Sequence, residues 1–152
     1  MTYQIDQSGK IEETAKPTVL AFSNNTQGSV IILAKDKKEI QKIYRQLNKP
    51  KMFTIQAFSA LVYLLLEKHK ISGKTITLDE EYKGQNSIIK SYVIQLAGKR
   101  NKIKTESGDV HFTGIGKKSN AHKLAIKCFR RKKADFTIKS EEIIALIMLY
   151  EK

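Results

Sequence analysis

The chain has 152 residues, of which 41% are hydrophobic, enough for one domain with its own core. Its 28 Lys and Arg residues against 15 Asp and Glu give a formal net charge of +13, which attracts polyanions. The single cysteine, Cys128, excludes an intramolecular disulfide, and three histidines do not complete a cysteine-rich zinc site. The apolar stretch from Met52 is interrupted by Gln56 and Ser59 and is shorter than the roughly 20 residues of a membrane span. With no signal-peptide pattern, we expect a cytoplasmic protein that does not bind membranes.

The first third of the chain predicts three strands and a helix. Apolar and polar residues alternate from Tyr3 before a turn at Ser8 and Gly9, which is typical of a strand. The runs "TVLAFSN" and "SVIILAK" flank the polar turn "NTQG", so they predict a hairpin. An amphipathic helix follows, with Asp36 as its candidate N-cap and Pro50 as its stop.

The rest of the chain alternates helices with two further strands. We expect strands at "KTITLD" and "VHFTGI", and helices over 52–70, from Asn86 or Ser87 to Gly98, from near Ser119, and from near Ser140. The resulting order is three strands, two helices, a strand, a helix, a strand and two helices. It predicts one α/β domain over residues 1–152, with a mixed five-stranded sheet and helices on both faces.

The positive charge is concentrated in one quarter of the chain. Between Gly98 and Lys133, twelve Lys and Arg residues face only Glu106 and Asp109, a net charge of +10. A merely solvated surface would spread its charge more evenly, so we expect nucleic acid as the partner. An anionic membrane, an acidic protein, or no specific partner are the alternatives. The candidate phosphate-binding residues are Lys99, Arg100, Lys117, Lys118, Lys123, Lys127, Arg130, Arg131, Lys132 and Lys133.

Four residues form a candidate catalytic group. Asp6 lies in the first predicted strand, and Asp79 and Glu81 follow the fourth, on the same side if the strand continues through them. His122 lies near the start of a predicted helix. Carboxylate oxygens are the ligands that Mg²⁺ and Mn²⁺ prefer, so Asp6 and Asp79 are candidate metal ligands. Each residue also has a simpler interpretation: a turn at Asp6, a solvated strand end at Asp79, and a capped surface histidine.

The segment "YQIDQSGKIE" resembles the first-strand signature of the ribonuclease H-like superfamily. The segment "GIGKKSNAHKLA" is similar to the family's last strand-to-helix segment, with His122 where an aspartate is usual. Together with the element order, the resemblance extends from Tyr3 to Phe129. It implies that the first and fourth strands are neighbours and that Asp6 and Asp79 hold two Mg²⁺ or Mn²⁺ ions, with Glu81 and His122 assisting. Some Holliday-junction resolvases of this fold tolerate histidine in the last helix, which favours that branch.

The resemblance therefore implies a divalent-metal-dependent nuclease, or a relative of one, that acts on structured nucleic acid. The family takes a further carboxylate from the helix after the third strand, where this chain offers Glu39, Glu67 or none. A missing ligand favours the alternative, a non-catalytic basic nucleic-acid-binding module that retains the fold. A third hypothesis is a protein-interaction domain with an acidic partner.

Overall fold

The computed structural model describes residues 2–150, which form a mixed six-stranded sheet in the order β5-β4-β1-β2-β3-β6. Strand β1 pairs antiparallel with β2 and β2 with β3, whereas β1 with β4, β4 with β5, and β3 with β6 are parallel. The carboxyl ends of β1, β4 and β5 therefore meet at the same end of the sheet. The strands are β1 (Thr2–Ser8), β2 (Thr18–Ser23), β3 (Gln27–Ile32), β4 (Thr75–Asp79), β5 (Val110–Thr113) and β6 (Phe136–Ile138).

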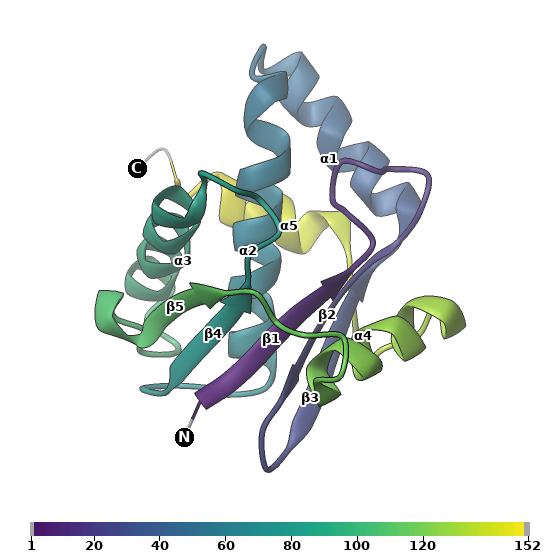
Figure 1. The fold of residues 1–152 in the computed structure, drawn as a ribbon. Helices are drawn as coiled ribbons and strands as arrows, with labels where there is room; N and C mark the ends of the chain where they lie inside the picture. Colours follow the sequence, from purple (N-terminus) through teal and green to yellow (C-terminus); the bar gives the residue numbers. More distant parts are fainter. Residues whose placement is uncertain (1, 151–152) are drawn as a thin grey trace.

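Helices cover both faces of the sheet unequally (Figure 1). On one face, α1, α2, α3 and α5 pack over the main core, while α4 alone covers the other face. No helix within residues 2–150 has both the length and the apolar composition needed to cross a bilayer. The helices are α1 (Ala34–Gln46), α2 (Phe53–Lys68), α3 (Asn86–Arg100), α4 (Asn120–Arg131) and α5 (Ser140–Ile147), with 3₁₀ turns at Pro50–Met52 and Ser107–Asp109.

Strand alternation explains the two cores. In β2, Leu20 and Phe22 belong to the main core, whereas Val19 and Ala21 point to the opposite face. The second, smaller core forms where these residues meet Ala125 and other apolar side chains of α4. Helix α2 is buried on most sides, as its nearly continuous apolar sequence predicts.

The prediction of a five-stranded sheet was wrong, because β6 adds a sixth strand. It pairs with the outer side of β3, from Val30 opposite Phe136 to Ile32 opposite Ile138. Only Ile138 of its three residues is buried, so the segment shows no alternation from which a strand could be predicted. The mixed α/β architecture with helices on both faces is confirmed.

Two predicted helix boundaries also differ. Helix α1 begins two residues before Asp36, whose Oδ1 instead accepts a hydrogen bond from the backbone of Ser140 at 2.9 Å. Gly98 lies inside α3, which ends at Arg100 and is capped by Asn101 in the left-handed conformation with φ of 54°. By contrast, Ser119 is the N-cap of α4, as expected, and its Oγ accepts from the backbone N–H of His122 at 3.0 Å.

A buried lysine fixes the connection between β1 and β2. Lys37 of α1 is 1% exposed, and its Nζ donates to the carbonyl oxygens of Lys10 at 3.0 Å and Glu13 at 2.8 Å, and to Oγ1 of Thr18 at 2.9 Å. Burial lowers the pKa of Lys37 to about 8. The connection that follows the end of β1 is thereby tied to α1.

Candidate metal centre

Parallel strands β1 and β4 bring the predicted acidic residues together. Ile5 and Leu78 belong to the main core, so their neighbours Asp6 and Asp79 project toward the opposite face, the side of α4. One ligand oxygen from each of Asp6, Asp79 and Glu81 lies within 4.8 Å of the others. The expected proximity of Asp6 and Asp79 is thus observed, and we call these three residues the acidic cluster.

Glu81 reaches the acidic cluster by a turn and not by strand alternation. Strand β4 ends at Asp79, and the backbone N–H of Glu81 donates to the carbonyl oxygen of Asp79 at 3.0 Å. Glu80 points elsewhere, and its Oε2 accepts from Nδ2 of Asn86 at 2.6 Å. The predicted grouping of Asp79 with Glu81 is therefore correct, but its predicted cause was wrong.

His122 contacts the acidic cluster from the first turn of α4. Its Nδ1 lies 2.6 Å from Oδ2 of Asp6, a carboxylate that is only 2% exposed. The other oxygen of Asp6 accepts from the backbone N–H of Gln7 at 2.8 Å. Both contacts orient the Asp6 carboxylate, and each oxygen retains a lone pair for a further ligand.

A backbone group that the sequence did not indicate orients Asp79. The N–H of Ile115, in the segment between β5 and α4, donates to Oδ1 of Asp79 at 2.7 Å. A side-chain pattern cannot reveal this contact, because any residue type other than proline supplies the donor.

Mutual repulsion and burial characterise the acidic cluster. Burial raises the pKa of Asp6, the charge of Asp79 adds to the rise, and the hydrogen bonds from Gln7 and His122 oppose it. Burial, a hydrogen bond with Asp79 and the charges of Asp79 and Asp6 together raise the pKa of Glu81 to about 7, against the effect of Lys10. These carboxylates are therefore held close together without enough positive charge to neutralise them.

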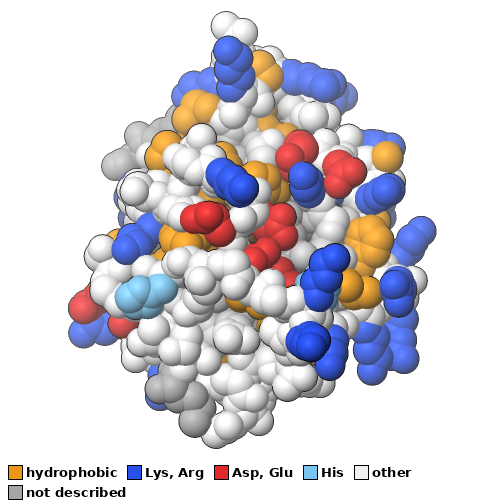
Figure 2. Space-filling model, in the orientation of Figure 1, with side chains coloured by type: hydrophobic (Ala, Val, Ile, Leu, Met, Phe, Trp, Pro, Cys, Tyr) orange, Lys and Arg blue, Asp and Glu red, His pale blue; other side chains and the backbone are white. Residues whose placement is uncertain are grey.

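The acidic cluster has the donor chemistry of a hard-cation site. Its donors are carboxylate oxygens alone, the type that Mg²⁺ and Mn²⁺ prefer. A bound cation would relieve the repulsion that raises the pKa of Asp6 and Glu81. The three residues therefore fit the predicted Mg²⁺ or Mn²⁺. Acidic side chains gather near the middle of the face seen in Figure 2, with many Lys and Arg side chains on the side where α4 lies.

A basic pocket of about 440 Å³ adjoins the acidic cluster through His122. Its lining is positively charged except for His122 and Ile126, and it carries no carboxylate. The lining cations are Lys117, Lys123, Lys127, Arg130 and Arg131. We call this the proximal pocket. Of the other predicted phosphate-binding residues, Lys118 precedes α4, and Lys132 and Lys133 follow it, all exposed.

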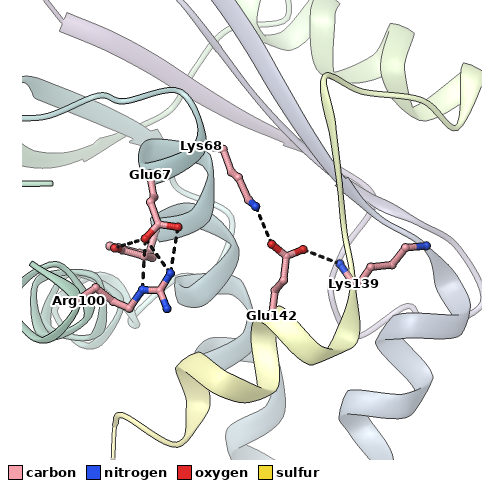
Figure 3. Close-up of polar contacts among 6 residues, drawn as sticks. Glu67, Lys68, Arg100, Lys139 and Glu142 are labelled. Carbon is pink, nitrogen blue, oxygen red and sulfur yellow. Dashed lines mark hydrogen bonds and ion pairs between the residues drawn. The ribbon is translucent and has the colours of Figure 1, made fainter. Parts of the chain in front are cut away.

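The structure does not bring Lys99 and Arg100 to this pocket. Both end α3, which packs on the other face of the sheet from α4 (Figure 1). The guanidinium of Arg100 donates to both carboxylate oxygens of Glu67, at 3.0 and 3.3 Å from Nη2 (Figure 3), and Nζ of Lys99 donates to the carbonyl oxygen of Leu149. Neighbours in the sequence thus belong to two different surfaces.

Neither helix carboxylate joins the acidic cluster. Glu67 is occupied by Arg100 and by the hydroxyl of Tyr63, which donates to Oε1 at 2.7 Å, and these contacts lower the pKa of Glu67 despite its burial. Glu39 is exposed on α1 and does not belong to the acidic cluster. Within residues 2–150, Asp6, Asp79 and Glu81 are the group of acidic residues that could hold a metal ion.

Comparison with known proteins finds no matching family model, no matching curated protein and no matching solved structure. The function therefore has to be inferred from the arrangement of this chain's own residues.

Proposed function

We propose that the protein is a divalent-metal-dependent nuclease that acts on structured nucleic acid. The carrying observation is the convergence of Asp6, Asp79 and Glu81 within 4.8 Å beside His122 and the basic proximal pocket. A pocket that attracts phosphates next to residues that attract cations has the components of phosphodiester hydrolysis. We infer Mg²⁺ or Mn²⁺ as the cofactor.

Membership of the ribonuclease H-like superfamily is part of this proposal. The adjacent, parallel β1 and β4 carry Asp6 and Asp79 in the places that the resemblance implies. The sixth strand, β6, is an addition to the five strands expected from that resemblance. A cytoplasmic location also belongs to the proposal, and the unpaired, buried thiol of Cys128 is compatible with a reducing compartment.

The acidic cluster would hold the cation through Asp6, Asp79 and Glu81. A divalent ion held there would supply Lewis-acid polarisation of a phosphoryl oxygen and activation of water. The chain itself orients the ligands: Gln7 and His122 hold Asp6, and Ile115 holds Asp79. Because Asp6 is 2% exposed, its orientation does not depend on solvent.

His122 is placed to position Asp6 and to handle a proton. Its Nδ1 contacts Asp6, and no hydrogen bond within residues 2–150 uses its Nε2. His122 also lines the proximal pocket, where a phosphate would lie. An imidazole held by a carboxylate at one nitrogen can accept or donate a proton at the other.

One observation favours a second function, a non-catalytic nucleic-acid-binding module. The carboxylate of Glu67, a candidate further ligand, is paired with Arg100 and Tyr63. A module that retained the fold and lost catalysis would keep the basic pocket and bind without cleaving. The same assay separates the two functions.

The test incubates the protein with duplex DNA, an RNA–DNA hybrid and a four-way junction, each with Mg²⁺, with Mn²⁺ or with EDTA. We expect metal-dependent cleavage of at least one substrate, and its loss in Asp6→Asn. Glu67→Gln is the matched control, because it makes the same chemical change in a carboxylate outside the acidic cluster. Binding of these substrates without cleavage under every condition would leave the binding module as the function.

A further inference from the structure

A second cavity lies on the other flank of α4. It measures about 250 Å³ and is bounded by the start of β3, the later turns of α4 and the segment that leads to β6. Lys127 and Arg131 line both this cavity and the proximal pocket, and Lys133 lines this cavity alone. The basic surface therefore continues across α4 from His122 to the β3 side. We call the second cavity the distal cavity.

The cations of the distal cavity are not neutralised by the protein. Within residues 2–150, Lys127, Arg131 and Lys133 form no ion pair with a carboxylate. One acidic residue, Asp135, also lines the cavity, and its Oδ2 accepts from the backbone N–H of Ser29 at 3.0 Å. Three cations against the one carboxylate of Asp135 leave a positive balance around this small cavity, which favours occupation by an anion.

The walls of the distal cavity are fixed in position. The backbone N–H of Asp135 donates to Oγ of Ser29 at 3.1 Å, and the thiol of Cys128 lies 3.6 Å from that same oxygen. Lys132 adopts the left-handed conformation with φ of 54°, and the backbone N–H of Lys133 donates to the carbonyl oxygen of Cys128 at 3.1 Å. This turn directs the chain back toward β3, so Lys133 does not lie at a frayed helix end.

We propose that the distal cavity binds a backbone phosphate of the same nucleic acid that the proximal pocket binds. The inference rests on the proposed nucleic-acid partner and adds that the substrate crosses the later turns of α4, held on both flanks of the helix. Lys127 and Arg131 line both cavities, so they would contact the backbone between these two points.

Metal-free binding tests the proposal, so the outcome does not depend on cleavage. Fluorescence anisotropy in EDTA would measure the affinity for a 16-base-pair DNA duplex. Lys133→Glu removes a cation from the distal cavity, and Gln27→Glu adds an anion to its exposed rim without removing a cation. We expect each to weaken binding about five- to tenfold, because Lys133→Glu loses one contact to a phosphate and Gln27→Glu places a negative charge beside it. Lys133→Ser should also make the slope of log affinity against log salt shallower by about 0.9.

Lys35→Glu is the matched control for charge, because Lys35 is exposed on α1, on the other face of the sheet. It should change affinity by less than twofold. Amide NMR signals of Ser29 and Lys133 should shift at the same duplex concentrations as that of His122. Equal affinities in Lys133→Glu, Gln27→Glu and Lys35→Glu, or shifts confined to the surroundings of His122, would overturn the distal site. Cleavage in the earlier assay could still stand in that case, and a failure of cleavage would leave this binding result intact.

Discussion

Two groups of partly buried carboxylates in this molecule have opposite environments. Glu67, between α2 and α3, is met by the guanidinium of Arg100 and the hydroxyl of Tyr63, and its pKa is lowered. In the acidic cluster, carboxylates face one another, and the pKa values of Asp6 and Glu81 are raised. Burial acts in the same direction in both places, so the difference comes from the neighbours. A carboxylate that the protein has neutralised stabilises the fold, whereas carboxylates left in mutual repulsion are available to an external cation.

The contacts around Glu67 extend to α5. Glu142 of α5 pairs with Lys68 of α2 at 2.7 Å, and its other oxygen accepts from the backbone N–H of Lys139 (Figure 3). The ion pairs thus join three helices that cover the main core. Substitutions in this region should change the stability of the fold, and they serve as a comparison for substitutions in the acidic cluster, which should change cation binding.

The largest expected effect is on cation binding by Asp6→Asn. We expect its affinity for Mn²⁺, measured by calorimetry or by electron paramagnetic resonance, to fall by more than the roughly 10- to 100-fold typical of outer-shell substitutions. The metal-free stability should stay the same or rise, because one repelling charge is removed. If Asp6→Asn bound Mn²⁺ with the affinity of the wild type, the acidic cluster would not be a metal site.

Glu67→Gln should lower the stability of the fold and leave cation binding unchanged, the reverse of what is expected for Asp6→Asn. The loss of its charge leaves Arg100, whose side chain is 30% exposed, without its partner. We expect the free energy of unfolding in urea to fall by about 2 kcal/mol, between the values for exposed and fully buried pairs. Mn²⁺ affinity should be unchanged. A loss of Mn²⁺ binding equal to that of Asp6→Asn would mean that the two carboxylate groups are not independent.

A smaller change should follow from Tyr63→Phe. The substitution removes the hydroxyl that donates to Glu67 at 2.7 Å and keeps the ring in the main core. We expect a loss of about 1 kcal/mol, the usual contribution of one hydrogen bond. Urea denaturation measures it, and a double-mutant cycle with Glu67→Gln should show coupling between the two residues. If the losses of stability in the two single variants simply added in the double variant, the hydrogen bond between Tyr63 and Glu67 would be contradicted.

A pH dependence of metal-free stability is also expected. The pKa of Glu81 is raised from 4.5 to about 7, so between these values the folded protein keeps a proton that the unfolded chain has released. The contribution of Glu81 to stability is therefore present below pH 4.5 and is lost as the pH rises to 7. Urea denaturation in EDTA at pH 5 and pH 7 measures the slope, and Glu81→Gln should reduce it. If stability depended on pH as strongly in Glu81→Gln as in the wild type, the raised pKa of Glu81 would be contradicted.

The proximity of Asp6 and Asp79 was predictable from their positions near strand ends together with the resemblance. Asp6 and Asp79 each lie near the end of a strand with a recognisable pattern, and the resemblance placed those strands side by side. His122 needed only the helix start at Ser119, which its capping sequence indicated. The sequence did not predict contacts that depend on the path of the chain between elements, such as the turn that brings Glu81 into the acidic cluster.

The division of the basic segment was not predictable from composition. Lys99 and Arg100 belong to the same charge run as Arg130 and Arg131, but α3 and α4 pack on opposite faces of the sheet. The partner of Arg100 is Glu67, 33 positions away. A run of positive charge in the sequence therefore shows which surface is basic only when it is known on which face of the sheet each helix packs.

Strand β6 also determines the order in which the molecule can be assembled. Its pairing with β3 and the contact between Ser29 and Asp135 join positions 106 residues apart, so the outer edge of β3 has no partner until residues 135–138 have been synthesised. Unpaired edges of this kind promote aggregation, and contacts between distant positions slow folding. A nascent chain stalled before residue 136 should therefore depend on chaperones, and refolding of the released protein should be limited by the docking of β6 and α5. The wall of the distal cavity that Asp135 supplies would form in the same step as the docking of β6.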